Sequence, residues 1–316
     1  MLGVVLAAGR GQRLRPLTDG RSKAMLPVAG KPMVARVLEM LIEGGVDRLI
    51  VVGHPEDAEL RAYLNRPEWA DRVTLTVQAE RRGMAQALQS AAPLIRASGV
   101  SDFVLAACDN FFPSGHVAAC VSQHRGTGAD ATVTLMRVRP EQIPTLAVVV
   151  LRDGWVEAIV EKPRPEEAPS DLGVPSLHVL SVRALGYLGR VPISPRGEYE
   201  FPDVLRLLIE GGGRVGGVEV AGRMTLTRPD DLLALNRYFL RHDPVSAVVE
   251  ADVTGCVVAP VRIEAGVALG PGCIVGPEVF LEAGCHCGSG AILRRAIVLR
   301  GAEVAAGVLV EDAVLG

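Results

Sequence analysis

Residues 6–33 read LAAGRGQRLRPLTDGRSKAMLPVAGKPM, a loop rich in glycine and arginine that follows a short apolar segment. Gly9 and Gly11 have no Cβ, so the backbone N–H groups of the loop can approach a phosphate closely. The same stretch carries several basic side chains, among them Arg10, Arg13, Arg15 and Lys23. Two glycines alone are also typical of a plain strand-to-helix turn. The charge around them favours a loop that binds a polyphosphate.

Outward from this loop, residues 2–183 alternate between apolar runs and helical patterns. The runs at 49–52, 103–107, 131–135 and 147–151 are typical of buried strands, and we expect 147–160 to form one long strand. Helical patterns cover 33–43, 84–97 and 117–125, and two further helices are expected at 202–210 and 229–240. This alternation predicts an α/β fold with a Rossmann-like, mostly parallel sheet and helices on both faces.

After residue 244 the sequence changes to a six-residue repeat. One apolar series comprises Val257, Ile263, Leu269, Val275, Leu281, Cys287, Leu293 and Leu299. A second series, two residues earlier, comprises Val261, Val267, Cys273, Val279, Cys285, Ala291 and Ile297. Such a period predicts a short parallel β-helix of three or four coils, and the period fades after Ala302. We therefore expect two domains, 1–243 and 244–316.

Composition excludes several classes of protein. The formal net charge of −3 argues against a nucleic-acid partner, which needs a dominant basic surface. No apolar run is long enough to span a membrane. The six cysteines show no regular pairing, so a reducing cytoplasm is expected. Cys285-His286-Cys287 could suggest zinc, but both cysteines fall in the apolar series and are expected to point into the coil.

The loop at 6–33 resembles the signature loop of sugar-1-phosphate nucleotidyltransferases. The resemblance is closest to glucose-1-phosphate thymidylyltransferases with a C-terminal left-handed β-helix, and it extends over essentially the whole chain. It implies transfer from a nucleoside triphosphate, with dTTP or UTP preferred, to a sugar 1-phosphate, using Mg²⁺ and releasing pyrophosphate. It also implies catalytic roles for Arg13 and Lys23, and nucleotide binding by these residues: Leu6, Ala8, Gly9, Gly11, Gln78 and Gly83.

The same resemblance assigns the remaining candidate residues. Asp109, which follows an apolar run, matches a metal-binding aspartate, although a helix cap is the alternative. Glu161 and Lys162 match a sugar-phosphate motif, and they could instead form a solvated surface pair. Arg196 matches a second sugar-phosphate contact and could be an ordinary loop arginine.

One departure concerns the metal. Thr225 aligns with a second metal-binding aspartate of the family, and a neutral hydroxyl is a poor Mg²⁺ ligand beside a carboxylate. Two interpretations remain open, an active enzyme with a reduced metal site and a homologue that binds nucleotide or nucleotide sugar without turnover. A structural scaffold, or a coenzyme A-dependent acyltransferase using His286, is a further alternative. The exposed ends of a short β-helix predict a homo-oligomer.

Overall fold

The computed structural model describes residues 1–251, 253 and 255–316. The chain forms two compact units, the first comprising Met1–Gly9 with Val37–Arg223 and the second Arg10–Arg36 with Met224–Gly316. Residues 10–33, which we call the basic loop, thus belong to the same unit as the C-terminal repeat, whereas residues 6–9 belong to the first unit. A domain boundary between residues 243 and 244 stays a prediction.

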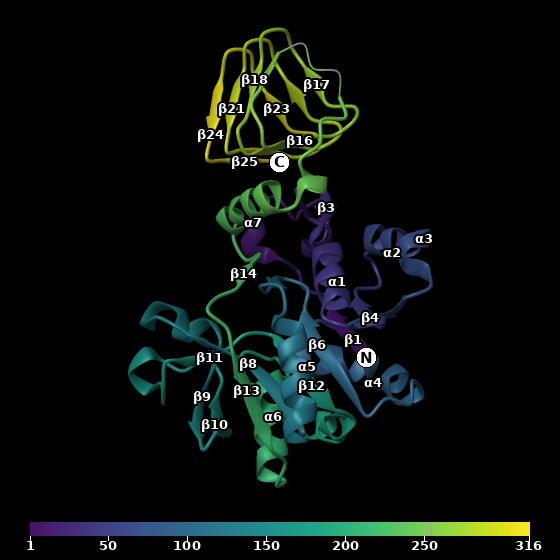
Figure 1. The fold of residues 1–316 in the computed structure, drawn as a ribbon, viewed down its shortest axis with the longest axis vertical. Helices are drawn as coiled ribbons and strands as arrows, with labels where there is room; N and C mark the ends of the chain where they lie inside the picture. The colour runs from purple at the N-terminus through teal and green to yellow at the C-terminus, as the bar shows by residue number, and fades with distance from the viewer. Residues whose placement is uncertain (252, 254) are drawn as a thin grey trace. The chain divides into compact units, whose positions relative to one another are not determined.

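The first unit is built on a mixed sheet with the order β11-β9-β10-β13-β8-β12-β6-β1-β4-β5 (Figure 1). Strands β6, β1, β4 and β5 run parallel to one another, and β12 is antiparallel to β6 and β8. The strands are β1 (Leu2–Leu6), β4 (Arg48–Gly53), β5 (Val73–Val77), β6 (Asp102–Ala107), β8 (Ala131–Arg137), β9 (Ala147–Arg152), β10 (Trp155–Val160), β11 (Leu172–Val174), β12 (Leu177–Ser181) and β13 (Val215–Glu219). A two-residue strand, β7 (Asn110–Phe111), follows β6.

Helices cover both faces of this sheet, as the sequence predicted. Alternate residues of β1 point to opposite faces: Leu2 and Val4 share a buried cluster with α4 and α6, whereas Gly3 lies against Leu41 of α1. On that second face, Gly44 after α1 meets Val117 of α5. The helices are α1 (Met33–Glu43), α2 (Ala58–Leu64), α3 (Pro67–Ala70), α4 (Met84–Ala97), α5 (His116–Thr127) and α6 (Phe201–Glu210).

The expected single strand over 147–160 is wrong. The chain reverses between Arg152 and Trp155, so that β9 and β10 form an antiparallel hairpin. Asp153 and Gly154 both adopt positive φ angles, 51° and 81°. An Asp-Gly pair favours this two-residue turn, because both central residues of the turn need left-handed backbone angles.

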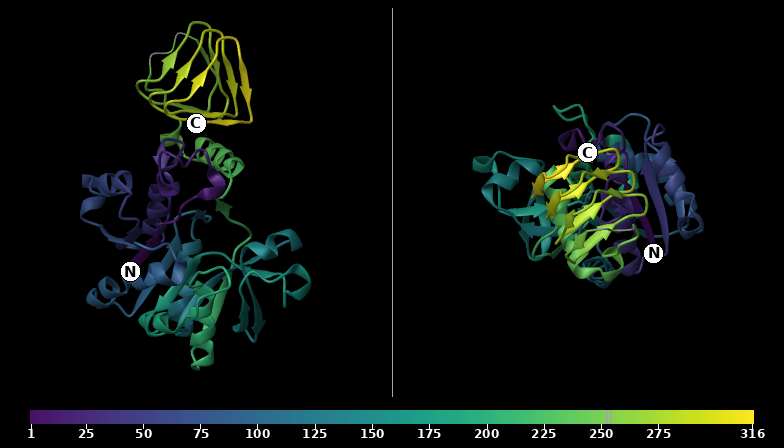
Figure 2. Two further views of the ribbon diagram at one scale, coloured as in Figure 1. Left: turned by 180° about the vertical axis from the view of Figure 1, so that it is seen from behind. Right: turned by 90° about the horizontal axis from the view of Figure 1, so that it is seen from above.

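The second unit joins the basic loop to α7 (Pro229–His242) and a three-sided parallel coil. Two short strands, β2 (Pro27–Val28) and β3 (Lys31–Pro32), close the loop, and β14 (Met224–Thr225) precedes α7. The right-hand view of Figure 2 shows the coils stacked rung on rung. The first side of the coil consists of β15 (Cys256–Val257), β18 (Ile274–Val275), β21 (Ile292–Arg294) and β24 (Leu309–Glu311). The second side consists of β16 (Val261–Ile263), β19 (Val279–Leu281), β22 (Ile297–Val298) and β25 (Val314–Leu315). The third side consists of β17 (Ala268–Leu269), β20 (His286–Cys287) and β23 (Glu303–Val304).

The six-residue repeat correctly predicts the coil, but after Leu293 the predicted positions no longer coincide with the residues that point into it. Most earlier members of both series are buried, and Val275, Leu281 and Leu293 have no exposed surface. Leu281 then pairs with Val298, 17 residues on, whereas Ile263 pairs with Leu281 at 18. The repeat therefore continues one residue out of step to β25 instead of fading after Ala302.

None of the helices among the described residues is both long and apolar enough to cross a membrane.

Candidate functional site

The carboxyl ends of the parallel strands bring several predicted residues to one edge of the first unit's sheet. Leu6 ends β1 and lies in register with Ala107 of β6 and Val52 of β4. Ala8 and Gly9 follow Leu6, Gln78 follows β5, and Asp109 follows β6. Open α/β sheets bind ligands beyond the carboxyl ends of their strands. This edge is therefore the candidate ligand-binding edge.

Gln78 and Gly83 form a braced turn at the start of α4. The Gln78 side-chain nitrogen donates to the Gly83 carbonyl at 3.0 Å and to the Gln86 side-chain oxygen at 2.7 Å. Gly83 has φ 95° and ψ 175°, and a Cβ on it would lie 2.5 Å from the Tyr199 carbonyl oxygen. Only glycine fits such a position. The buried Gln78 thus holds the turn with its amide nitrogen, a role that the sequence did not reveal.

Tyr199 connects this turn to the segment around Arg196. Its N–H donates to the Arg82 carbonyl at 2.8 Å, and its carbonyl accepts the Ala85 N–H at 3.1 Å. On the other side, the Arg81 Nε donates to the Ala8 carbonyl at 2.7 Å. Arg81 is a contact that the sequence analysis missed, although two adjacent arginines before Gly83 were a visible signal. The turn is thus fixed to β1 and to the Arg196 segment together.

Glu161, Lys162 and Arg196 lie together with a fourth charged residue, Glu200. The Glu161 carboxylate accepts from Lys162 Nζ at 3.0 Å and from Arg196 at 3.1 Å, and Arg196 also donates to Glu200 at 2.7 Å. The Ser194 hydroxyl donates to the same Glu200 oxygen at 3.0 Å. These residues are not scattered surface charges, because the two carboxylates are largely buried while the two cations are partly exposed. We call Glu161, Lys162, Arg196 and Glu200 the four-charge cluster.

The environment of the four-charge cluster affects Glu161 and Lys162 in different ways. Burial raises the pKa of the Glu161 carboxyl, and the adjacent Lys162 ammonium opposes that rise. Lys162 adopts a φ of 44°, a left-handed backbone angle unusual for a residue with a side chain. Strained backbone of this kind is concentrated at functional sites. Sequence could have indicated Glu200, which lies four residues after Arg196 and directly before α6.

Asp109 lies on the turn between β6 and β7. The Asn110 side-chain nitrogen donates to Asp109 Oδ1 at 2.6 Å, which orients the carboxylate. Asn110 itself is buried, and its Oδ1 has no hydrogen-bond partner among the described residues. No group of three or more His, Cys, Asp and Glu side chains in the described ranges could enclose a metal. Asp109 is thus an oriented carboxylate that does not belong to such a group.

The basic loop in the second unit has its own internal supports. Gly11 has φ 64° and begins a short 3₁₀ turn over Gln12–Leu14. The Thr18 hydroxyl donates to the Gly11 carbonyl at 3.0 Å, and a Cβ on Gly11 would lie 3.0 Å from Cβ of Lys23. Arg13 is exposed on this turn. Gly11 therefore allows the two ends of the loop to approach each other.

Thr225 lies in the second unit, in β14. Its hydroxyl is 3.1 Å from that of Thr227, so the two side chains share a hydrogen bond. Neither group carries the charge that a Mg²⁺ ligand normally supplies.

The two cysteines of the alternative zinc site lie in hydrophobic surroundings. Cys285 and Cys287 are buried in the coil, whereas His286 between them is exposed. His178 is buried in β12, where its ring stacks on Phe201 at 4.8 Å. Burial lowers the pKa of His178 to about 3, so this imidazole is neutral at physiological pH.

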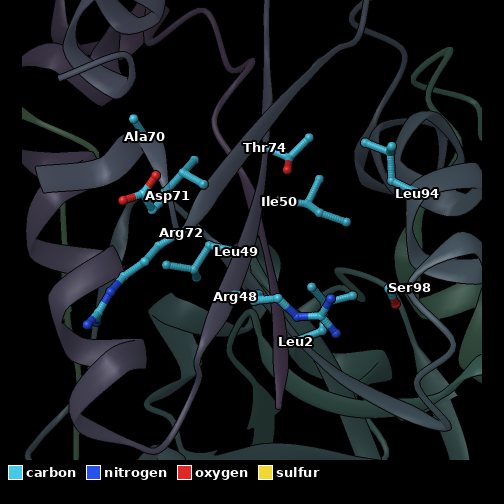
Figure 3. A pocket seen from close by; sticks show the side chains of 11 residues that line it. Leu2, Arg48, Leu49, Ile50, Ala70, Asp71, Arg72, Thr74, Leu94 and Ser98 are labelled. Atoms are coloured by element: carbon cyan, nitrogen blue, oxygen red, sulfur yellow. The ribbon is translucent and has the colours of Figure 1, made fainter. Parts of the chain in front are cut away.

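A pocket of ≈ 160 Å³ lies at the opposite edge of the first unit's sheet (Figure 3). Leu2, Arg48 and Val73 line it from the amino ends of β1, β4 and β5. None of the predicted site residues lines this pocket, so it is separate from the candidate ligand-binding edge.

Several known proteins resemble this chain in sequence and in fold. The nucleotidyl transferase family matches residues 2–223. The UTP–glucose-1-phosphate uridylyltransferase of Haloferax volcanii is 32% identical over 73% of this chain and 93% of its own length. A glucose-1-phosphate thymidylyltransferase of Streptomyces griseus is 30% identical over 89% of this chain and 78% of its own. A solved UDP-glucose pyrophosphorylase complexed with UDP-glucose shares the fold, with a TM-score of 0.69 at 20% identity over 76% of this chain and 98% of that one. The chain therefore belongs to the nucleotidyl transferase family.

Proposed function

We propose that this protein joins a nucleoside triphosphate to a sugar 1-phosphate, giving a nucleotide sugar and pyrophosphate. The observation that carries the proposal is the four-charge cluster, which Tyr199 links to the Gly83 turn. A sugar phosphate needs both hydroxyl acceptors and cations, and the cluster offers both. We propose dTTP or UTP as the donor, since relatives that use UTP and thymidine nucleotides match this chain over most of its length.

In this reaction an oxygen of the sugar phosphate attacks the α-phosphorus in line, and pyrophosphate leaves. The protein has to bring two anions together and to stabilise the charge that develops in the transition state. We assign the sugar hydroxyls to Glu161 and the sugar phosphate to Lys162 and Arg196. When phosphate binds, these two cations would exchange part of their pairing with Glu161 for the phosphate oxygens.

We assign the binding of the triphosphate to the end of β1 and the basic loop that follows it. The backbone around Gly9 and Gly11 approaches the phosphates, and Leu6 and Ala8 lie where β1 ends. Arg13 and Lys23 supply the positive charge, Arg13 for the departing pyrophosphate and Lys23 at the reacting phosphate. Gln78 and Gly83 shape the surface that faces the base.

Asp109 fits a magnesium ion that completes its shell with water and substrate phosphates. Mg²⁺ is commonly held by one or two carboxylates together with phosphate oxygens, so the oriented Asp109 carboxylate meets the minimum. When bound, the ion would neutralise phosphate charge. Asp109 would hold it at the end of β6, where Asn110 fixes the carboxylate.

A second candidate is a protein that binds nucleotide or nucleotide sugar without turnover. It is favoured by Thr225, whose neutral hydroxyl pairs with that of Thr227 where the family resemblance implies a second metal-binding carboxylate. Both candidates share the same binding residues, and they differ in catalysis alone.

Pyrophosphate release tests the two candidates. The wild-type chain is assayed with Mg²⁺ across nucleoside triphosphates and sugar 1-phosphates, beside Asp109→Ala and Thr225→Asp. Turnover that Asp109→Ala abolishes supports the enzyme. No turnover by the wild type, with nucleotide still bound and turnover appearing in Thr225→Asp, supports the binding protein. No nucleotide binding at all would refute both.

We further propose a homo-oligomer in the cytoplasm, with no nucleic acid or membrane as partner. All six cysteines are free thiols, and five of them are buried. Free thiols of this kind fit a reducing compartment. Size-exclusion chromatography with light scattering would measure the oligomeric state.

A further inference from the structure

The side of the coil formed by β16, β19, β22 and β25 is covered within the second unit. Phe280 and Ile297 lie in register on this side, and Phe280 stands between the inward-facing Val279 and Leu281. Phe280 therefore points out of the coil, and Ile297 beside it does the same. Both side chains are nevertheless fully buried. Helix α7 contacts β25 on this side, as Figure 1 also shows.

Charged corners of the coil fix α7 in place. Glu278, Arg295 and Asp312 occupy equivalent corners and all adopt positive φ angles, 61°, 47° and 50°. Arg241 of α7 pairs with Glu278, and Arg237 pairs with Asp312. The same helix reaches the basic loop, because the Asn236 side-chain oxygen accepts the Ala29 N–H at 3.1 Å.

The carboxyl-terminal part of the loop is also held by a buried arginine. Arg36 donates to the Val28 carbonyl at 2.9 Å and pairs with Asp243 at 2.9 Å. Its guanidinium lies 3.9 Å from the ring centroid of Phe239 in α7. This end of the loop is therefore fixed on several sides.

The coil also contacts the loop directly, two residues before Lys23. Arg21 Nη1 donates to Glu282 Oε1 at 2.8 Å, and the two side chains are only 6% and 12% exposed. Glu282 follows β19 on the covered side of the coil. A nearly buried pair of this kind strongly resists separation, since each charge would be left without a partner.

Glu282 also accepts a hydrogen bond from the next coil, and Glu264, at the equivalent position of the preceding coil, does the same. The other oxygen of Glu282, Oε2, accepts the Arg300 N–H of the next coil at 2.9 Å. Glu264, 18 residues earlier, accepts the Ala283 N–H in the same way at 3.0 Å. Glu264 thus joins successive coils without an ion pair to the loop among the described residues. The extra contact of Glu282 with Arg21 is therefore not needed to build the coil.

We propose that Glu282 is a positioning residue for the basic loop and acts through Arg21 on Lys23. The inference rests on the proposed function, which places Lys23 at the reacting phosphate. Without the Glu282 charge, Arg21 would turn toward solvent and move the backbone that precedes Lys23. The β-helix then serves nucleotidyl transfer as the support of its catalytic loop.

The test compares Glu282→Gln with its matched control, Glu264→Gln, in the full chain. Glutamine keeps the acceptor for the coil-to-coil bond in both variants, and only Glu282→Gln removes the charge that faces Arg21. Displacements of about 1 Å can cost on the order of 100-fold in rate. We therefore expect Glu282→Gln to lower kcat/KM for the nucleoside triphosphate by about 10- to 100-fold, with Glu264→Gln within about twofold of wild type. Glu282→Gln should also lower the urea midpoint relative to Glu264→Gln, because it leaves the nearly buried Arg21 without its charged partner, so the kinetics are compared well below both midpoints.

Two further measurements make the result specific. Arg21→Lys retains the ion pair with Glu282 and should therefore keep most of the activity. Titration with dTTP or UTP measures loop positioning without turnover. A wild type that binds nucleotide but shows no turnover would refute the enzyme, and weaker binding by Glu282→Gln would still support positioning. Equal binding and kinetics in Glu282→Gln and Glu264→Gln would overturn the inference.

Discussion

Gly83 offers a sharp test of the braced turn at the start of α4. A Cβ there would lie 2.5 Å from the Tyr199 carbonyl oxygen, whereas ordinary contacts begin near 3.4 Å. The carbonyl cannot retreat freely, because it accepts the Ala85 N–H and its own residue donates to Arg82. Gly83→Ala therefore strains two hydrogen bonds, worth about 0.5–1.5 kcal/mol each, and adds about 1–3 kcal/mol for the backbone angles. We expect Gly83→Ala to destabilise the protein by about 3–4 kcal/mol.

Gly99, beyond the other end of the same helix, provides the control. Its φ is 72°, and a Cβ on it would meet no atom within 4 Å. Gly99→Ala should cost only the left-handed conformation, about 1 kcal/mol. The difference of at least about 2 kcal/mol corresponds to roughly 1 M in the urea midpoint, for a slope of about 2 kcal/mol per M.

Kinetics provide the second readout for this pair. Because Tyr199 adjoins Glu200, a displaced Tyr199 should raise the KM for both substrates in Gly83→Ala, whereas Gly99→Ala should leave both unchanged. Equal urea midpoints for the two alanine variants, or unaltered kinetics in Gly83→Ala, would refute the close contact as the reason for this glycine.

Three further changes test other parts of the structure. Burial lowers the pKa of His178 to about 3, whereas in the unfolded chain its ordinary value is 6.5, so the unfolded chain binds one more proton between these pH values. The free energy of unfolding of the wild type should therefore fall by up to about 1.4 kcal/mol per pH unit as the pH drops from 6.5 toward 3. Urea titrations at each pH should show a smaller fall for His178→Leu, and parallel curves for the two proteins would contradict a buried neutral ring. Iodoacetamide added to the native protein should label the exposed Cys256 but not the buried Cys120, because burial raises the pKa of the Cys120 thiol to about 11. Mass spectrometry after digestion identifies the labelled sites, and strong labelling of Cys120 would be incompatible with its burial. Glu161→Gln should raise the KM for sugar 1-phosphate by roughly 10-fold, since bonds to a charged group contribute about 1.5–3 kcal/mol, with a smaller effect on the nucleotide; equal effects on both would argue against the assigned role.

The sequence predicted regular elements best where the pattern was long. The bounds of α1 and α4 agree with the ranges 33–43 and 84–97, because each forms an amphipathic face over several turns. The hairpin of β9 and β10 was missed because both strands are apolar. Only Asp153-Gly154 marks the turn, and a two-residue signal is easily overlooked inside an apolar run.

The site was predictable in its residue types but not in its connections. Sequence neighbours such as Glu161 and Lys162 were visible, and the structure adds that Arg196 contacts the same carboxylate. Glu200 was missed although its spacing of four residues from Arg196 was visible in the sequence, since that spacing does not reveal that the carboxylate is buried beside the arginine. The internal bonds of Gln78 were equally hidden, because an amide that holds its own turn has no distinctive pattern.

The phase shift in the coil has a physical origin that explains which residues leave its interior. Between the inward-facing Val275 and Val279 the corner holds three residues, Gly276 to Glu278, whereas the next corner holds only Arg294 and Arg295. The shorter corner turns Ala296 and Val298 inward, so Ile297 and Leu299 point outward instead of continuing the series. Both are still buried, and a Cβ on Gly316 would lie within 3.2 Å of both Leu299 and Leu17 of the basic loop. The residues that break the repeat are therefore those that the coil presents to the rest of the second unit. Their apolar character is needed for that packing, and this is why the sequence appeared to keep its period at positions that had changed face.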